Sequence, residues 1–113
     1  MANLRIMYWK EIPIQVQAED DSDIISKQLD DRFQQGVDAI AMEDGSAGTD
    51  DYLLGWEWGE YTVVDGTAEE AAQATANHIN DSMPPDFVNR IRKMQADGTR
   101  DPSAGAVGHW LKE

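Results

Sequence analysis

Apolar and polar residues alternate along residues 4–17, and this pattern predicts a β-hairpin. Residues 4–9 carry bulky side chains on both sides of the first strand. Residues 12–17 alternate Ile, Ile and Val with more polar neighbours, which indicates a half-buried second strand. Pro13 places that strand at an edge or near its own start. Lys10 and Glu11 link the two strands, although neither is a favoured residue in tight hairpin turns.

The spacing of apolar residues changes to threes and fours further along, which predicts one long helix up to Asp44. The acids of residues 19–23 suit a helix start, because negative charge complements the N-terminal end of the helix dipole. Asp21 or Ser22 would cap it. Gly45 would end the helix by adopting a left-handed conformation. The expected apolar stripe consists of Ile25, Leu29, Phe33, Val37, Ile40 and Ala41.

A loop with a short turn and a strand should follow. Thr49 can cap a turn formed by residues 52–54. Residues 56–64 read as a strand, but Trp56 and Trp58 have the opposite parity to Tyr61. This change of phase predicts a β-bulge near Gly59.

Two more helices complete the expected fold. Thr67 and Glu70 form a capping box for a helix that runs to about Asp81. Residues 84–85 are both proline, which ends that helix and suits the first turn of the next one. Gly98 would end the last helix. The predicted order is therefore ββαβαα.

This order indicates a small α+β domain over residues 1–98, with a three-stranded sheet and helices packed on one face. Residues 99–113 read as a loop-like tail, which Trp110 and Leu111 would dock back on the domain. The length of 113 residues fits a single domain.

Charge and composition narrow the function classes. The net charge is −13, from 22 Asp and Glu against 9 Lys and Arg. Such acidity opposes binding to nucleic acid and to anionic membranes, and favours basic partners. The absence of cysteine excludes disulfides, thiolate metal sites and thiol catalysis. No apolar run suits a signal peptide or a membrane span, so a cytoplasmic location is expected.

No pattern of residues completes a catalytic or metal site. His78 and Asp81 are three residues apart and could share a metal only if His109 folded back, and we expect no metal. Adjacent acids such as Asp50 and Asp51 point apart on a helix or strand and are expected to be solvated. We therefore expect no catalytic residues and no cofactor. The main basic cluster, Arg90, Arg92, Lys93 and Arg100, reads as a solvated helix face or, alternatively, as a contact for an acidic partner or a phosphate ligand.

The aromatic residues of the first half form the candidate partner-binding site. One interpretation is a recognition patch in which aromatic anchors surround an arginine. The other is a core cluster in which Arg32 forms a salt bridge with a nearby acid. Because Arg32 adjoins Phe33, it should lie at the rim if Phe33 is buried. The six candidate residues are Tyr8, Trp9, Arg32, Asp51, Tyr52 and Trp56.

Several short motifs in the first half of the chain together resemble a known family. They are Tyr8-Trp9-Lys10-Glu11-Ile12-Pro13, Arg32-Phe33-Gln34, Asp38, Ala41-Met42, Gly45, Gly48-Thr49-Asp50, Tyr52-Leu53 and Trp56. With these motifs the chain resembles the bacterial "virulence factor" domain family over about residues 4–97. It departs from that pattern in residues 57–60, in its acidity and after Gly98.

The resemblance implies an accessory role, with a link to folate or corrinoid one-carbon metabolism as one expectation, and no catalytic residues to carry over. The first hypothesis is therefore a non-catalytic accessory or protein-interaction protein. The alternative is a small-ligand-binding protein or small enzyme, in which Tyr8, Trp9, Arg32 and Trp56 line a pocket and Asp51 accepts a proton. A third hypothesis is a homodimer that buries Trp58 and Trp110.

Overall fold

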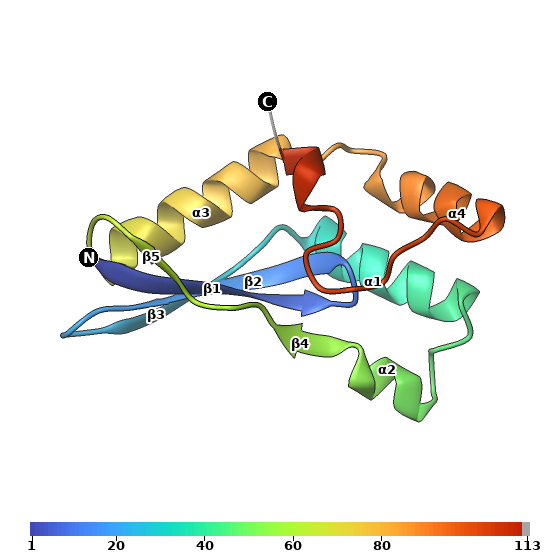
Figure 1. Cartoon of the computed structure of the whole chain (residues 1–113), viewed down its shortest axis with the longest axis horizontal. Helices are drawn as coiled ribbons and strands as arrows, with labels where there is room; N and C mark the ends of the chain where they lie inside the picture. The colour runs from blue at the N-terminus through green and yellow to red at the C-terminus, as the bar shows by residue number, and fades with distance from the viewer. Residues whose placement is uncertain (112–113) are drawn as a thin grey trace.

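The protein is an antiparallel sheet with helices on one face, as the computed structural model in Figure 1 shows; it describes residues 1–111. Helices α1 and α3 cover the sheet, α4 packs on α1, and α2 adjoins β4 at the sheet edge. The elements in chain order are β1 (Ala2–Trp9), β2 (Ile12–Glu19), β3 (Ile24–Gln28), α1 (Asp31–Glu43), α2 (Asp50–Leu54), β4 (Trp56–Trp58), β5 (Thr62–Val64), α3 (Ala68–Ser82), α4 (Phe87–Asp97) and the 3-10 helix η1 (Gly108–Leu111).

Strand β1 lies at the centre of the sheet, whose strand order is β3-β2-β1-β4, with β5 also paired to β1. The predicted hairpin is confirmed, because β1 and β2 pair as antiparallel neighbours from Asn3 opposite Glu19 to Trp9 opposite Ile12. Lys10 closes the turn in a left-handed conformation, with φ of 50°. Its backbone N–H donates to the carbonyl of Gly55 at 2.7 Å, which ties the turn to the end of α2.

Strands β4 and β5 are two parts of one bulged edge strand. Met7 lies opposite Trp58 and Leu4 lies opposite Thr62, so three steps along β1 correspond to four along its partner. Gly59 stands at the break, where its N–H donates to the carbonyl of Ile6 at 2.8 Å. The extra residue is a β-bulge, and the bulge predicted near Gly59 is confirmed.

The prediction of one long helix is wrong in its first part. Residues 24–28 form β3, which pairs with β2, and α1 begins only at Asp31. The acids before β3 make a turn instead of a helix start: the carboxylate of Asp20 accepts the N–H groups of Ser22 and Asp23, each at 2.8 Å. Asp side chains compete with helix formation in this way. With β3 added, and with β4 and β5 counted separately, residues 1–111 form a sheet of five strands where three were expected.

The other predicted helix boundaries are close to those observed. Gly45 follows α1 with φ of 84°, and Gly98 follows α4 with φ of 76°. Thr49 caps α2 by accepting the N–H of Asp51. The capping box of Thr67 at the start of α3 is present with both of its hydrogen bonds.

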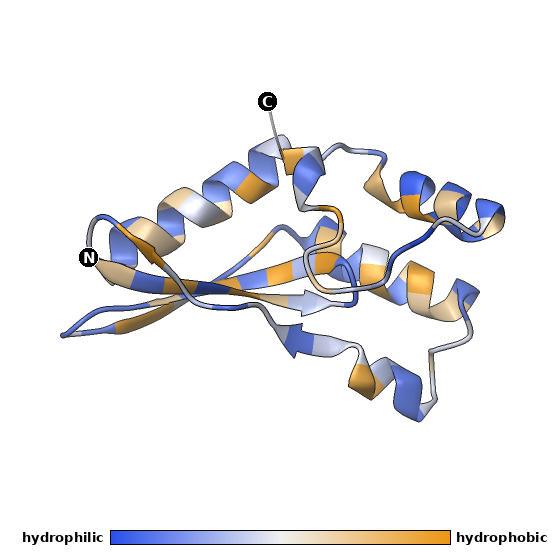
Figure 2. Cartoon of the chain, in the orientation of Figure 1, coloured by the Kyte–Doolittle hydropathy of each residue, from blue (hydrophilic) through white to orange (hydrophobic). Residues whose placement is uncertain are grey.

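The core lies between the sheet and helices α1 and α3. Figure 2 shows apolar bands recurring along α1 and along the central strands. Helix α3 contributes mostly alanines, whose small side chains let it lie close to the sheet but bury little apolar area. The fully buried side chains with the largest volumes include Trp9, Phe33, Ile12, Ile79 and Ile91.

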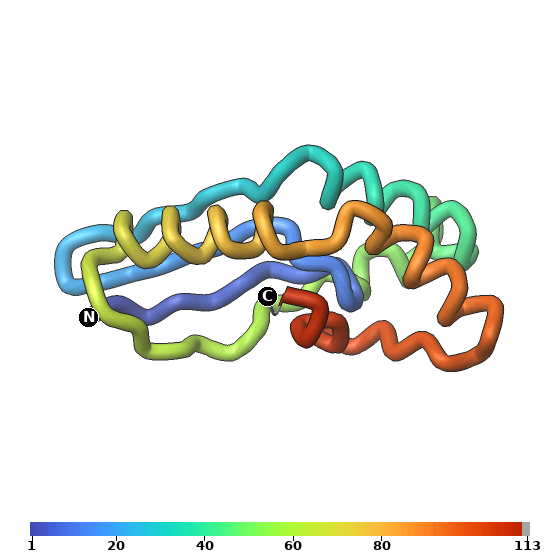
Figure 3. The backbone as a smooth tube through the Cα atoms, turned by 90° about the horizontal axis from the view of Figure 1, so that it is seen from above, coloured from blue at the N-terminus to red at the C-terminus, as the bar shows by residue number. Residues whose placement is uncertain are grey.

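The chain turns back after Gly98, and residues 99–111, here called the strap, run from the end of α4 toward the middle of the molecule and finish beside the C-terminal end of α3 (Figures 1 and 3). Val107 is buried, and Trp110 and Leu111 pack against the core. The last two residues of the expected tail, 112 and 113, lie outside the described residues.

Candidate functional site

Trp9 is a core residue, because its side chain is fully buried. Its indole Nε1 donates to the carbonyl of Tyr52 at 2.9 Å, and the two rings lie 5.7 Å apart. A Cβ built on Gly55 would lie 2.7 Å from the same Nε1, so only glycine fits there without movement. Trp9 therefore supports α2 from below and has no exposed surface of its own.

Three of the other candidate residues lie together at the junction of α2 and β4. Tyr52 and Trp56 are half-buried, and their rings meet edge to face with centroids 6.0 Å apart. Asp51 is exposed in the first turn of α2. The structure thus brings Trp9, Asp51, Tyr52 and Trp56 into one neighbourhood, with Trp9 as its buried base.

Tyr8 belongs to a different neighbourhood. Adjacent residues of a strand point to opposite faces, and Tyr8 lies under the strap, where a Cβ on Gly105 would be 3.6 Å from its hydroxyl oxygen. Burial raises the pKa of the Tyr8 hydroxyl. Tyr8 therefore packs against the C-terminal end of the described chain and not against Tyr52.

Arg32 lies at a rim, as expected, but its main partners are carbonyl groups. Its guanidinium donates to the carbonyls of Asn80 at 2.8 Å, Met83 at 3.1 Å and Pro84 at 3.3 Å. The expected acid is Asp30, at 3.9 Å. Because the last carbonyls of a helix lack partners within it, Arg32 caps the end of α3 and fastens α1 to it.

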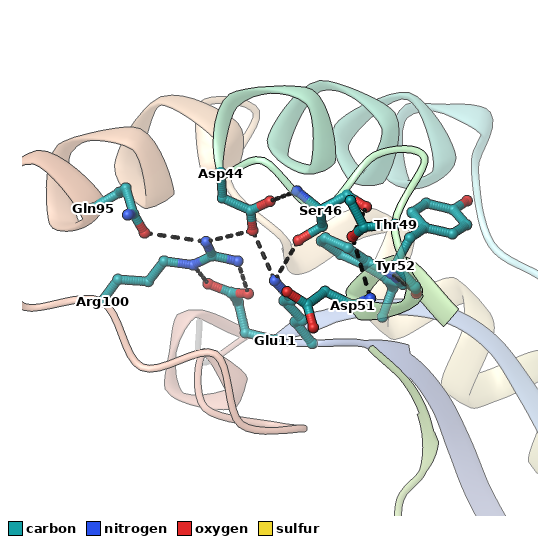
Figure 4. Close-up of polar contacts among 10 residues, drawn as sticks. Glu11, Asp44, Ser46, Thr49, Asp51, Tyr52, Gln95 and Arg100 are labelled. Atoms are coloured by element: carbon teal, nitrogen blue, oxygen red, sulfur yellow. Dashed lines mark hydrogen bonds and ion pairs between the residues drawn. The ribbon is translucent and has the colours of Figure 1, made fainter. Parts of the chain in front are cut away.

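A network of charged residues, not predicted from the sequence, joins the β1–β2 turn, the end of α1 and the strap (Figure 4). Glu11 is fully buried, and its two carboxylate oxygens accept Nε and Nη2 of Arg100 at 2.7 and 2.8 Å. Asp44 accepts Nζ of Lys10 at 2.8 Å and Nη1 of Arg100 at 3.1 Å. Ser46 accepts a second hydrogen bond from Lys10 at 2.8 Å.

The network is balanced, with two carboxylates opposite two cations. Burial raises the pKa of Asp44, but hydrogen bonds from Lys10, Ser46 and Arg100 outweigh that effect and lower it from 3.8 to about 2. The hydrogen bonds to Glu11 raise the pKa of Arg100 above its usual value. Each carboxylate of the network thus has a cationic partner, and these pairs tie the strap and the end of α1 to the β1–β2 turn.

The sequence carried little signal for this network. Glu11 and Arg100 are 89 residues apart, so no local pattern pairs them. Arg100 was grouped with Arg90 and Arg92 on a solvated helix face. That interpretation fits Arg90 and Arg92, which are exposed and paired with Asp86 and Glu43, but it is wrong for the buried Arg100.

The surface around α2 combines exposed apolar side chains with shallow hollows. Met42, Leu53 and Leu54 are 76%, 67% and 78% exposed. One hollow of about 280 Å³ borders Met42 and Tyr52, and another of about 280 Å³ borders Leu54 and Lys10. We call this region the α2 surface; it comprises Met42, Tyr52, Leu53 and Leu54, with Asp38, Asp50, Asp51 and Glu57 at its rim.

Within residues 1–111 no three His, Asp or Glu side chains are grouped so that they could hold a metal ion. His78 contacts Ser82, at 3.3 Å, and not a second potential ligand. None of the helices in the described chain is long and apolar enough to span a membrane.

Comparisons with known proteins identify a family and nothing closer. No curated protein and no solved structure matches the chain. Residues 7–91, which include β1 from Met7 onward and extend into α4, match the family described as Virulence factor. This range agrees with the resemblance expected over about residues 4–97. The chain therefore belongs to the Virulence factor family.

Proposed function

We propose that this protein is a non-catalytic accessory protein of the bacterial cytoplasm that binds a protein partner through the α2 surface. The observation that carries the proposal is the exposure of Leu53 and Leu54, neighbours in α2, and of Met42, which borders a hollow with Tyr52 of the same helix; each of the three is at least 67% accessible to solvent. Single exposed apolar residues are common in folded proteins, whereas grouped ones mark interaction sites.

The rim of the α2 surface indicates the chemistry of the partner. Asp38 borders the same hollow as Met42, Asp51 and Glu57 border the same hollow as Leu54, and Asp50 begins α2. The whole chain carries a net charge of −13. Negative potential attracts basic surfaces and raises their association rate. We therefore expect a partner segment with an apolar face flanked by lysine or arginine. Tyr52 within the surface and Trp56 beside it, both half-buried, would act as the rigid aromatic anchors.

This proposal keeps three of the six candidate residues as contacts, namely Asp51, Tyr52 and Trp56. Trp9 has a supporting role beneath them, because no part of it reaches the surface. Tyr8 and Arg32 hold other parts of the fold together, as their contacts with the strap and with the end of α3 indicate.

The test is affinity capture from the cells that make the protein, with two matched variants and quantitative mass spectrometry. Leu53→Arg places a charge on the α2 surface. Ile24→Arg is the control, because Ile24 is also 67% exposed but lies on β3 at the far edge of the sheet. We expect Leu53→Arg to lose the partner and Ile24→Arg to retain it, with both variants as stable as the wild type. Equal capture by all three proteins would refute the proposal.

The small-ligand alternative has weaker support from the geometry. The indole of Trp9 is buried and the guanidinium of Arg32 is engaged by three carbonyls, so neither is free to grip a ligand. The link to folate or corrinoid one-carbon metabolism rests on the resemblance. A thermal-shift screen with folates, corrinoids and nucleotides tests it, because a ligand that binds only the native state raises the Tm.

The homodimer hypothesis also has less support, because both tryptophans already have partners within the chain. Arg5 stacks on Trp58 at 3.9 Å, and Trp110 packs against the core. A monomeric mass in solution would exclude the dimer.

A further inference from the structure

The strap lies over a groove of the domain formed by residues 1–98. The floor of the groove includes Ile6, Tyr8, Ile79 and Met83, and Val107 of the strap, which is only 4% exposed, closes it from above. The charged end of the groove is Glu11, which is fully buried beneath Arg100. The groove therefore has an apolar floor and an acidic end. We call the acidic end, formed by Glu11 and Asp44, the slot.

The strap is attached to this groove through side chains only. Among the residues that the structure describes, 101–111 form backbone hydrogen bonds only with one another, from Ala106 to Ser103, Gly108 to Gly105 and Trp110 to Val107. The N–H groups of Thr99 and Arg100 bond to the carbonyl of Met94 at the end of α4. No strand ladder joins the strap to the sheet, so the groove recognises a few side chains and not a continuous backbone.

The acidic slot selects a guanidinium. Arg100 meets Glu11 through two parallel hydrogen bonds and reaches Asp44 with its remaining nitrogen. A lysine ammonium cannot reproduce this planar fork. Emptying the slot would leave a buried carboxylate without its counter-ion, which is strongly unfavourable. Replacing one guanidinium in the slot by another therefore changes the free energy little, whereas removing the guanidinium without a replacement is unfavourable.

The carboxylates and the arginine of this network also differ in whether they lie within the residues that match the family. Glu11 and Asp44 lie within the matched residues 7–91, whereas Arg100 lies beyond them. The slot thus belongs to the part of the chain shared with the family, and its present occupant does not.

We propose that the slot of Glu11 and Asp44 binds an arginine side chain from a basic segment of a partner protein, and that the strap is an internal competitor for the same groove. The strap defines what such a segment needs: an arginine, a glycine at the position of Gly105, whose φ of 79° disfavours other residues, and an aliphatic residue in the place of Val107. A partner is favoured over a second copy of this chain, because two molecules of net charge −13 repel each other.

The probe is a fluorescein-labelled peptide with the sequence of residues 98–111, titrated into the full-length protein and followed by fluorescence anisotropy. A second peptide carries Arg100→Lys as its only change. Three proteins are compared: the wild type, Arg100→Lys, and Leu53→Arg, which alters the α2 surface and leaves the groove intact. Circular dichroism checks that each protein is folded.

Competition predicts a specific order of affinities. The wild type should bind the arginine peptide weakly, because its own strap occupies the groove. Arg100→Lys should bind it about tenfold more tightly, since apparent affinity scales with the fraction of protein whose groove is open. The lysine peptide should bind each protein about tenfold more weakly than the arginine peptide, because it cannot form the bidentate pair with Glu11. Leu53→Arg should bind both peptides as the wild type does. A result that contradicts the proposal for the groove can therefore be told apart from one that contradicts the proposal for the α2 surface.

Two results would overturn the proposal. The first is equal binding of the arginine and lysine peptides to the wild type, a comparison that needs no variant to fold. The second is a dimer of Arg100→Lys in sedimentation equilibrium, because the groove would then accept the strap of a second copy. Binding that discriminates arginine from lysine in a monomeric protein supports it.

Discussion

Replacing Asp44 by Asn should destabilise the protein by about 1–2 kcal/mol at neutral pH, and by progressively less as the pH falls. The magnitude follows from the pKa of Asp44, which is lowered from 3.8 to about 2 in the folded protein. Each pKa unit corresponds to about 1.4 kcal/mol, so a shift of about two units sets an upper value near 2.5 kcal/mol. Lys10 is 21% exposed, and solvent screens part of its attraction to Asp44, which reduces the expected value.

The pH dependence has a definite sign. Because the folded-state pKa lies below the unfolded-state value, the unfolded protein binds more protons between about pH 4 and pH 2. The contribution of Asp44 is therefore complete above about pH 4 and is lost as the pH falls through about 2. Urea denaturation of the wild type and Asp44→Asn, followed by tryptophan fluorescence at several pH values, gives the difference in free energy of unfolding.

The difference between the two proteins isolates Asp44 from the other acids, which titrate in both. We expect it to be constant from about pH 7 to about pH 5 and to shrink below about pH 4. A difference that stayed the same down to about pH 2.5 would refute the reasoning, because the effect of the substitution would then come from packing and not from charge.

Three further changes, one of them with a matched control, test the packing and the caps. Gly55→Ala should cost about 1–3 kcal/mol in urea denaturation, because its Cβ would lie 2.7 Å from Nε1 of Trp9. Gly108→Ala, whose Cβ would meet no atom within 4 Å, should have little effect, and equal effects would contradict this account. Arg32→Lys should lower the free energy of unfolding by about 1–2 kcal/mol, because an ammonium cannot replace the three hydrogen bonds to the carbonyls at the end of α3. An unchanged Tm would show that these hydrogen bonds do not stabilise the fold. Thr67→Ala should lower the free energy of unfolding by about 1 kcal/mol through loss of the N-cap. Hydrogen exchange at the amide of Glu70, which bonds to the Thr67 hydroxyl, should become faster.

Features with local chemical causes were predictable from the sequence. Thr49 and Thr67 cap helices because a hydroxyl can accept the unpaired N–H groups of the first turn. The bulge at Gly59 was visible as a change of parity within one apolar run. In each case the residues that decide the structure lie within a few positions of one another.

Strand β3 was mistaken for helix because two different elements share one spacing. Ile25, Leu29 and Phe33 are four residues apart, as on a helix, but Ile25 belongs to β3 and Phe33 to α1. The deciding feature was the turn at Asp20, whose carboxylate also accepts the N–H of Ala68 at 2.7 Å. These three backbone bonds lower the pKa of Asp20. A contact with a residue 48 positions away cannot be read from local pattern.

The six candidate residues were divided between separate neighbourhoods by contacts of the same long-range kind. The sequence left Trp9 either in a recognition patch or in a core cluster, and the contact that decides for the core is made with Tyr52 of α2, 43 residues later in the chain. Glu11 was interpreted as a turn residue, and its burial depends on Arg100. Side chains whose environment comes from distant segments need the fold before their role can be assigned.

The central position of β1 has a consequence for how the chain is made in the cell. The β1–β2 hairpin can form as soon as Glu19 has left the ribosome, but the second edge of β1 is paired only after residues 56–64 have been synthesised. During that interval the nascent chain exposes an unpaired strand edge and the ring of Trp9. Changes that delay β4 should therefore reduce the yield of folded protein through aggregation during synthesis, even where the purified protein is as stable as the wild type.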